Sequence, residues 1–363
     1  MNLLKSNFVI IGNKKARRKI AKELENNPLK LCGQNMEEVK EIKFLGDYIG
    51  PSCEESIHTT VSKRISIAKQ TINEIRTIIE DRRAKSIGGI NIAFDIFNAA
   101  VIPMVLNNGE TWWNMKKKTL KALNGLFNYF FRLIFRIGSG CPVINFYIQV
   151  GCLKVEAVLL RMQLNFCYHL ANLSPSALGR QTWDLQVNHR LPGLYLSVED
   201  HLNKLNFHQN KSVSKWQWEK LVREYTDQFN LNLLDEEAKR YKKVSFDQHT
   251  NGELKRQAYF YELNLDQVRY RFRLSSLMSD CAKANFPTKY RGKSLKCDDC
   301  KYILDSNTTL DITNDENISS QKHYIEICPK YTDLRVQFDT MTDIGLVEFF
   351  HAVSIRRMEN ESE

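Results

Sequence analysis

The sequence predicts a mostly α-helical protein with a small β element at the N-terminal end and a zinc knuckle near the C-terminus. Three observations carry this prediction. Apolar residues recur at helical spacing over long stretches, a short β-like segment surrounds Phe44-Leu45-Gly46, and four potential zinc ligands lie after residue 296. With 363 residues the chain is long enough for about two or three domains.

Residues 1–51 are expected to form the β element. A short strand is predicted over Lys5–Ile11, ended by Gly12-Asn13, and a basic helix is expected from there to about Leu24. A hairpin is predicted over Val39–Ile49, centred on Phe44-Leu45-Gly46, where the glycine permits a turn or a close backbone approach. The hairpin either belongs to a core or holds a nucleic-acid backbone, and the residue pattern leaves both open.

The strongest helix signal begins at Ser52, which fits a capping box with Glu55. Apolar residues then recur in steps of three or four, at Ile57, Val61, Ile65, Ala68, Ile72, Ile75 and Ile79. Basic residues lie off this stripe, at Lys63, Arg64, Lys69, Arg76, Arg82 and Arg83. This basic face either contacts the phosphates of an RNA–DNA duplex or is only solvated, as charged helix faces usually are.

Further helices are predicted along the chain. Gly88-Gly89 precedes an apolar helix over Ile90–Leu106, which Pro103 bends or ends early. A turn at Asn107-Asn108-Gly109 leads to a helix over Lys116–Arg136. The stretch 179–214 is ambiguous and is expected to contain loop. The remaining predicted helices cover 155–171, 215–230, 235–243 and 252–284.

Composition bounds the partner and the compartment. Lysine and arginine total 52 against 42 aspartate and glutamate, and this basic excess favours a polyanionic partner. The odd number of cysteines, 9, and their scattered positions favour a reducing, intracellular environment, nuclear or cytoplasmic, over secretion. The longest uncharged run, 137–153, contains glycine, proline and amide residues and does not predict a membrane span.

Four residues have the spacing of a structural zinc site. The pattern C-x2-C…H-x4-C predicts a tetrahedral zinc held by three thiolates and one imidazole. The ligands are Cys297, Cys300, His323 and Cys328. Chance spacing of scattered cysteines is the alternative. The segment between the two halves, 301–322, is rich in Asp, Asn, Ser and Thr and suits a solvated loop.

Basic residues precede the zinc set and favour a nucleic acid as its partner. The expected phosphate contacts are Arg269, Arg271, Arg273, Arg291 and Lys293. Tryptophans either stack on unpaired bases or, as is more common, anchor the helical core. These tryptophans are Trp112, Trp113, Trp216 and Trp218.

Four motifs occur in a fixed order. They are Lys5-Ser6, then Lys43-Phe44-Leu45-Gly46, then Ala100-Val101-Ile102-Pro103 followed by Asn107-Asn108-Gly109-Glu110-Thr111-Trp112, and finally the Cys/His set with Arg335 after it. In this order they resemble the C-terminal portion of a non-LTR (LINE-type) retrotransposon reverse transcriptase. The resemblance implies a palm remnant with a primer-grip hairpin over 1–51, a helical thumb over 52–140, a helical linker over 141–288, and a knuckle with its tail over 289–363.

The sequence departs from this family where catalysis takes place. The resembled polymerases carry metal-binding carboxylates in a Tyr/Phe-x-Asp-Asp hairpin and an earlier Asp motif, and no such set occurs here. Phosphoryl transfer needs those carboxylates to hold two metal ions, and the carboxylates of a restriction-like nuclease are missing too. We therefore expect a truncated, non-catalytic RNA- or DNA-binding polypeptide, with Lys43, Phe44, Leu45, Gly46, Lys63 and Arg64 among its contacts.

Two alternatives stay open. The chain is the thumb-supplying part of a polymerase whose palm is encoded upstream or in a separate polypeptide, or it is a helical protein-interaction scaffold with a structural zinc.

Overall fold

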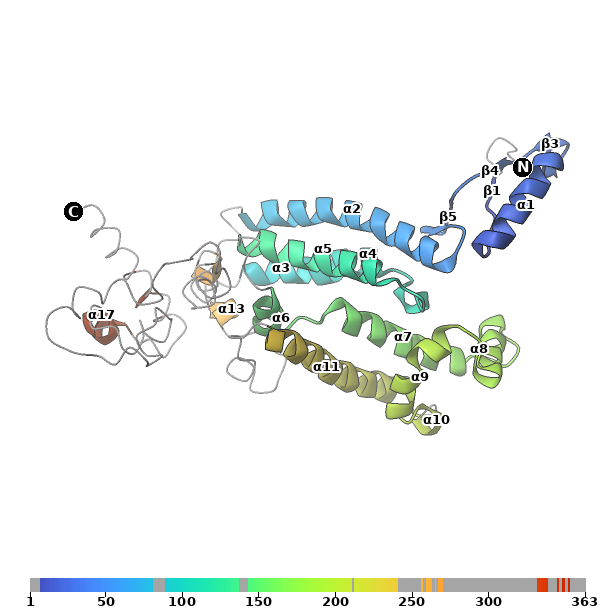
Figure 1. Cartoon of the computed structure of the whole chain (residues 1–363). Helices are drawn as coiled ribbons and strands as arrows, with labels where there is room; N and C mark the ends of the chain where they lie inside the picture. Colours follow the sequence, from blue (N-terminus) through green and yellow to red (C-terminus); the bar gives the residue numbers. More distant parts are fainter. Residues whose placement is uncertain are drawn as a thin grey trace, which may run out of the picture. The chain divides into compact units, whose positions relative to one another are not determined.

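The computed structural model describes residues 7–80, 89–136, 143–210 and 212–240, with short pieces between 256 and 352. These residues are mostly helical, as the sequence predicts (Figure 1). The chain divides into two compact units. The first comprises Met1–Ile72, Asn98–Phe127 and Leu153–Asn230, and the second comprises Asn73–Phe97, Asn128–Cys152 and Leu231–Glu363. Each unit draws on several of the four expected segments, whose bounds stay a prediction.

The strands of the described residues all lie before residue 50 and pair two by two. β1 (Asn7–Phe8) pairs in parallel with β4 (Glu37–Glu38), β2 (Lys30–Leu31) pairs antiparallel with β3 (Gln34–Asn35), and β5 (Ile42–Phe44) pairs antiparallel with β6 (Asp47–Ile49). The β5–β6 hairpin lies inside the predicted range. The strand expected over residues 5–11 has only two residues in the described part.

The other elements of the described residues are helices. They are α1 (Lys14–Asn26), α2 (Cys53–Glu80), α3 (Ile90–Ile96), η2 (Phe97–Val101), α4 (Ile102–Leu106), η3 (Gly109–Thr111), α5 (Lys117–Phe135), α6 (Ile144–Val150), α7 (Val155–Ala171), α8 (Leu178–His189), α9 (Leu194–Lys204), α10 (Phe207–Asn210), α11 (Lys215–Arg240), α13 (Tyr259–Glu262) and α17 (Thr332–Gln337).

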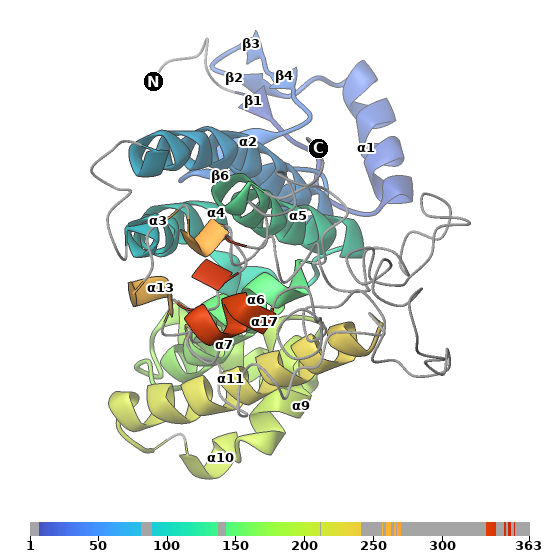
Figure 2. The same cartoon turned by 90° about the vertical axis from the view of Figure 1, so that its left-hand side faces the viewer.

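The basic helix α1 forms at the expected place and contributes no residue to the core. The side chain of Asn13 caps it by accepting a hydrogen bond from the Ala16 amide at 2.9 Å, which satisfies one of the free donors of the first turn. None of its residues is buried. Figure 2 shows α1 beside the pair of short strands β1 and β4.

Helix α2 confirms the strongest sequence signal. The Ser52 hydroxyl accepts a hydrogen bond from the Glu55 amide at 3.3 Å, as an N-cap does. The expected stripe is buried except at Ile65, which is half-buried. The neighbouring residue, Arg64, is buried in its place and is only 8% exposed. Arg64 and Ile65 lie three and four residues after Val61, so both fit the helical spacing. The sequence pattern favoured the apolar residue, Ile65.

The segment over 90–106 is interrupted, in agreement with the prediction made from Pro103. A π-helical turn, η2, separates α3 from α4, and Pro103 is the second residue of α4. Proline has no backbone N–H to donate, and a π-helical turn directly before it is one way in which a helix accommodates the missing hydrogen bond. Phe97 and Val101 both have right-handed helical dihedral angles, so the backbone stays helical through this π-helical turn and the apolar pattern continues across it.

One stretch that the sequence leaves ambiguous is mainly helical with short loops, and one sequence prediction is wrong. The ambiguous stretch 179–214 is mainly helical, because α8, α9 and α10 bury Trp183, Leu194 and Phe207 in one core. The dipeptide Pro192-Gly193 separates α8 from α9 and is a strong local break signal. The two helices expected over 215–230 and 235–243 are one helix, α11, up to Arg240. The helix expected over 252–284 lies mostly outside the described residues.

The first unit has a core around Trp218, which is fully buried. Its indole stacks on Tyr168 at 5.4 Å between ring centroids, and Phe207 meets it edge-on at 5.3 Å. Helices α7, α8 and α9 pack against one another here (Figure 1). Trp112 is also buried, whereas Trp216 is 70% exposed. The core interpretation thus holds for Trp218 and Trp112 and fails for Trp216.

The second unit has a core that is rich in phenylalanine. Phe97 stacks on Phe130 at 3.9 Å, and Phe94 meets Phe130 edge-on at 5.7 Å and Phe260 at 6.1 Å. Phe260 comes from α13, which packs against α3. Asn91 fixes this contact by donating a hydrogen bond to the Phe260 carbonyl at 2.9 Å. Edge-to-face aromatic pairs add about 0.5–1.5 kcal/mol each beyond burial alone.

Candidate nucleic-acid interface

The tip of the β5–β6 hairpin consists of Leu45 and Gly46. Their φ angles are 46° and 89°, and positive φ at both central residues is the requirement of a type I′ turn, whose twist matches that of the strands. Glycine adopts this conformation freely, but for leucine it costs about 1–2 kcal/mol. Backbone strain of this kind persists only where the surroundings over-determine it, and it concentrates at functional sites.

The tip is exposed although it is apolar. The exposed fraction is 59% for Phe44 and 82% for Leu45, and Lys43 beside them is exposed as well. The interpretation of Phe44-Leu45-Gly46 as part of a core is therefore wrong, whereas Ile42, Tyr48 and Ile49 are half-buried. A Cβ atom on Gly46 would meet only the Arg64 guanidinium, at 4.0 Å, so the backbone here is open to a close approach.

A largely buried ionic network holds the base of this tip. One carboxylate oxygen of Asp47, Oδ1, accepts a hydrogen bond from Arg64 Nη2 at 2.7 Å, and the other, Oδ2, accepts one from Asn108 Nδ2 at 2.6 Å. Arg64 also donates to the carbonyl of Asn107 at 2.5 Å and to that of Gly46 at 3.2 Å. The guanidinium therefore joins the hairpin, helix α2 and the Asn-Asn-Gly turn. We call Asp47, Arg64 and Asn108 the anchor triad.

Two further contacts fix the hairpin along α2. The Tyr48 amide donates a hydrogen bond to Thr60 Oγ1 at 2.8 Å, one turn before Arg64. The Lys63 ammonium pairs with Glu41 and lies 3.8 Å from the centre of the Tyr48 ring. Cation–π contacts of this kind contribute about 0.5–1 kcal/mol at exposed sites. The hairpin thus contacts two successive turns of the helix.

A second set of contacts joins the start of α2 to the start of α5. Glu54 pairs with Lys116 at 2.6 Å and accepts a hydrogen bond from Asn114 at 3.1 Å. The hydrogen bond from Lys116 holds the pKa of the Glu54 carboxyl below its usual range. His58 lies 3.0 Å from Thr119 Oγ1, and burial, together with the charges of Lys118 and Lys116, lowers its pKa. These effects favour the neutral form of the His58 ring, which links α2 to α5 through Thr119.

Two expected contacts do not lie on an exposed basic face. Arg64 is 8% exposed and is bound within the anchor triad, so the interpretation that it lies on a solvated face of α2 is wrong. Arg269 belongs to the second unit and is 3% exposed, with its Nε donating to the Ile134 carbonyl at 2.8 Å. Lys63 is engaged with Glu41, although its side chain is still 44% exposed. The guanidinium groups of Arg64 and Arg269 are therefore held by acceptors of the protein itself.

The other predicted contacts lie outside the described residues. This applies to Arg271, Arg273, Arg291 and Lys293, and to the zinc ligands Cys297, Cys300, His323 and Cys328. In the described part no three His, Cys, Asp or Glu side chains are grouped as metal ligands. Zinc at the Cys/His set therefore stays a prediction.

The basic residues of α1 form a dense exposed positive charge at the N-terminal end. The segment 14–22 contains six lysines and arginines and no acidic residue, and most of their side chains are exposed. Lys14, Lys15, Arg18, Lys19 and Lys22 are the exposed ones. Since the helix buries nothing in the core, this charge is available to a polyanion.

Asp47 and Asn108 were not predicted from the sequence. Both flank or belong to motifs that the sequence shows, the Phe-Leu-Gly tip and the Asn-Asn-Gly turn, but nothing in the spacing indicates that the two motifs meet. The sequence contained one signal for this contact, because Arg64 lies at a position that also fits the apolar stripe of α2. A buried charge requires a partner, and Asp47 is the acidic residue directly after the predicted turn.

Comparisons of the chain with protein-family models, with curated proteins and with solved structures find no match. Among the helices of the described residues, none combines the length and the apolar character needed to cross a bilayer.

Proposed function

We propose that this chain binds RNA or DNA through the tip of hairpin β5–β6, Lys43 to Gly46, and through the basic helix α1. The observation that carries the proposal is an apolar turn that is exposed, strained and yet firmly held. Leu45 is 82% exposed at a φ of 46°, and the anchor triad fixes the turn from below. A leucine at this positive φ lowers stability compared with glycine or asparagine, which supports a role of the turn in contact with a partner.

The chemistry of the tip suits a nucleic-acid strand. Phe44 offers an aromatic face on which a base or sugar can pack, and Lys43 offers a charge for the adjacent phosphate. Gly46 has no side chain, so a sugar–phosphate backbone can approach its main chain closely. These contacts read no base sequence, and we expect affinity without strong sequence preference.

Helix α1 supplies the electrostatic part of the proposal. Each phosphate that a lysine or arginine neutralises releases counterions, so the affinity falls as the salt concentration rises. The resemblance to a reverse transcriptase adds that the tip would hold a primer strand. In that case the catalytic carboxylates come from a palm on a preceding segment or another polypeptide, and this chain binds without catalysis.

A structural zinc at Cys297, Cys300, His323 and Cys328 is part of the same proposal. The residue types suit zinc, because three thiolates and one imidazole form a closed tetrahedral shell. The basic residues before it, among them Arg271, Arg273, Arg291 and Lys293, would add phosphate contacts.

Fluorescence anisotropy with a labelled single strand and an RNA–DNA duplex tests the proposal. The logarithm of the affinity should fall linearly with the logarithm of the salt concentration. In the double variant Lys15→Gln, Arg18→Gln the slope should become shallower by about one for each phosphate that the variant no longer neutralises. The matched control is Lys215→Gln, Lys220→Gln on α11, which removes equal charge and should leave the slope unchanged. Affinity that does not respond to salt would rule the proposal out.

A further inference from the structure

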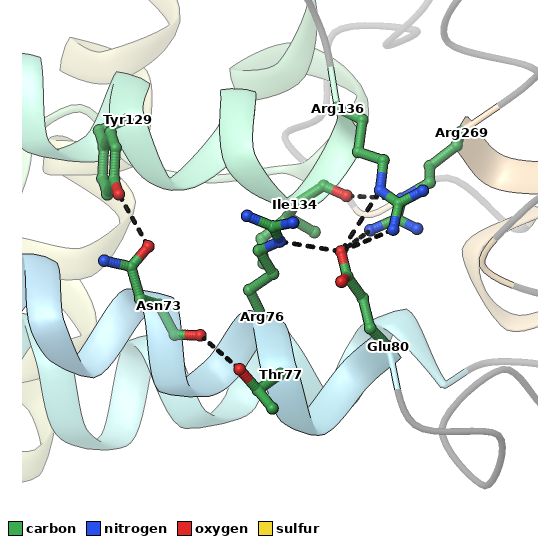
Figure 3. A network of polar contacts seen from close by, with 8 residues as sticks. All are labelled: Asn73, Arg76, Thr77, Glu80, Tyr129, Ile134, Arg136 and Arg269. Carbon is green, nitrogen blue, oxygen red and sulfur yellow. Dashed lines mark hydrogen bonds and ion pairs between the residues drawn. The ribbon is translucent and has the colours of Figure 1, made fainter.

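In the second unit, three guanidinium groups surround one carboxylate (Figure 3). Glu80 Oε1 lies 3.0 Å from Arg76 Nε, 2.9 Å from Arg136 Nη2 and 3.4 Å from Arg269 Nη2. Glu80 ends α2, Arg136 follows the last residue of α5, and Ile134 in the last turn of α5 accepts the hydrogen bond from Arg269. The cluster therefore lies where two helices end.

The positive charges outnumber the negative ones here. Three guanidinium groups against one carboxylate leave two positive charges. The C-terminal ends of the two helices contribute about half a negative charge each, which reduces the surplus to about one positive charge. Donors are in excess as well, because each arginine carries five N–H groups whereas a carboxylate offers about four acceptor positions.

Arg76 is the arginine of this cluster whose terminal N–H groups can donate hydrogen bonds to a ligand. Its contact with Glu80 uses Nε, and its terminal nitrogens make no contact with the other residues drawn in Figure 3. Its side chain is 45% exposed, whereas that of Arg269 is 4% exposed. Arg136 and Arg269 thus neutralise Glu80, and Arg76 presents its outer edge to solvent.

The surface beside Arg76 is hollowed and is lined by residues with polar side chains. An open depression of about 650 Å³ is lined by Asn73, Arg76, Thr77 and Glu80, which lie on one face of α2. Asn73 Oδ1 accepts a hydrogen bond from the Tyr129 hydroxyl at 2.8 Å, and this bond leaves the amide NH₂ of Asn73 as a donor (Figure 3). Arg76 and Asn73 are one helical turn apart and line the same depression.

We propose that Arg76 and Asn73 form a binding site for an oxyanion, in particular a phosphate group. The fork of a guanidinium matches two oxygens of a phosphate, and the amide of Asn73 donates to a third. Because Arg136 and Arg269 neutralise the Glu80 carboxylate, its repulsion of the bound anion is weakened. The site is independent of the hairpin tip and stands whether or not the tip binds nucleic acid.

Two sources of phosphate share this chemistry, a free phosphate ester and the backbone of a nucleic acid. Isothermal titration calorimetry of the full chain with inorganic phosphate tests the site itself. A second titration with a short single-stranded oligonucleotide that carries no terminal phosphate distinguishes the sources.

Three variants sharpen the test. Arg76→Gln removes the fork from an exposed side chain, and Asn73→Asp keeps the acceptor for Tyr129 but replaces the donor with a negative charge. Arg190→Gln is the control, because Arg190 is exposed in a bidentate pair with Glu199, where one charge balances one. Circular dichroism establishes that each variant is folded.

We expect wild type and Arg190→Gln to bind phosphate alike. Arg76→Gln should bind it about tenfold or more weakly, and Asn73→Asp should show no binding at all. If oligonucleotide binding weakens in Arg76→Gln too, the site takes backbone phosphate; if only inorganic phosphate binding weakens, it serves a free phosphate ester. Absence of phosphate binding in wild type, or equal affinity in Arg76→Gln, would overturn the proposal.

Discussion

The Arg64 guanidinium lies 2.7 Å from the Asp47 carboxylate, and this ion pair joins the turn of a short hairpin to a long helix. The side chain of Arg64 is 9% exposed and that of Asp47 30% exposed, so the pair is largely removed from water. The second carboxylate oxygen of Asp47 reaches Asn108 in the turn before η3. One acidic residue therefore sets the position of two segments that lie far apart in the sequence.

Asp47→Ala should destabilise the first unit strongly. The substitution leaves a buried guanidinium without its counter-charge, and breaking a buried pair in this way costs about 3–5 kcal/mol. The measurement is the free energy of unfolding from urea denaturation. The control is Asp184→Ala, which removes an i,i+4 partner of Arg180 that is 43% exposed and should cost about 1 kcal/mol or less.

The double variant Asp47→Ala, Arg64→Met provides the decisive comparison. Removing both charges leaves no unpaired ion, so stability should return toward the wild-type value. If the double variant is as unstable as Asp47→Ala alone, the instability does not come from an unpaired guanidinium but from the lost hydrogen bonds of Asp47.

Sequence patterns predict those helices that bury one continuous apolar face, and they miss helices that depend on a core shared with distant segments. The stripes of α2, α5 and α7 predict their helices closely because each helix buries one continuous apolar face. Helices α8–α10 were missed because Pro192-Gly193 and short segment lengths resemble a loop until the shared core around Trp218 is known.

The candidate site could be predicted only in part. Phe44-Leu45-Gly46 predicted a hairpin turn, since the glycine permits one, but left open whether the turn is buried or exposed. The anchor triad could not be predicted, because its members are brought together by tertiary packing across dozens of residues. For the same reason the burial of Arg269 against Ile134 has no local signal.

Leu45→Asn should raise stability and weaken nucleic-acid binding at the same time. Asparagine tolerates a positive φ better than leucine, so the free energy of unfolding should rise by about 1 kcal/mol. Leu178→Asn is the matched control, because Leu178 is 79% exposed at the start of α8 and should change neither quantity. A stability loss in Leu45→Asn would show that the leucine is not strained.

Glu80 should make stability depend on pH in a defined direction. Burial raises the pKa of its carboxyl, but the hydrogen bonds and charges of Arg136 and Arg76 outweigh burial and lower it overall. A folded pKa below the unfolded value, about 4.3, means that the contribution is present above that pH and is lost as the pH falls through the folded pKa. Glu80→Gln should therefore be less stable than wild type at pH 7, and the difference should shrink in acid.

Denaturation of both proteins across this pH range measures that difference. A gap between wild type and Glu80→Gln that stays constant from neutral to acidic pH would contradict the ionic role of Glu80. A stability difference that widens in acid would mean that folding raises the pKa of Glu80 and does not lower it.

Cys297→Ser tests the zinc prediction. Removing one thiolate from a closed four-ligand site should release about one zinc ion per chain and loosen the residues around it. Elemental analysis of purified protein gives the metal content, and Cys53→Ser is the control, since Cys53 is an exposed cysteine at the start of α2. Equal zinc content in Cys297→Ser and wild type would rule out this ligand set.

The central claim is that the tip of hairpin β5–β6 contacts nucleic acid. Anisotropy titration of Lys43→Gln, Leu45→Asn against wild type, with Lys215→Gln, Leu178→Asn as the control that removes equal charge and apolar surface, tests it most directly. We expect the tip variant to bind RNA or DNA about tenfold more weakly, which corresponds to about 1.4 kcal/mol, and the control to bind like wild type. Equal affinity of the tip variant and wild type at the same salt concentration would contradict the claim.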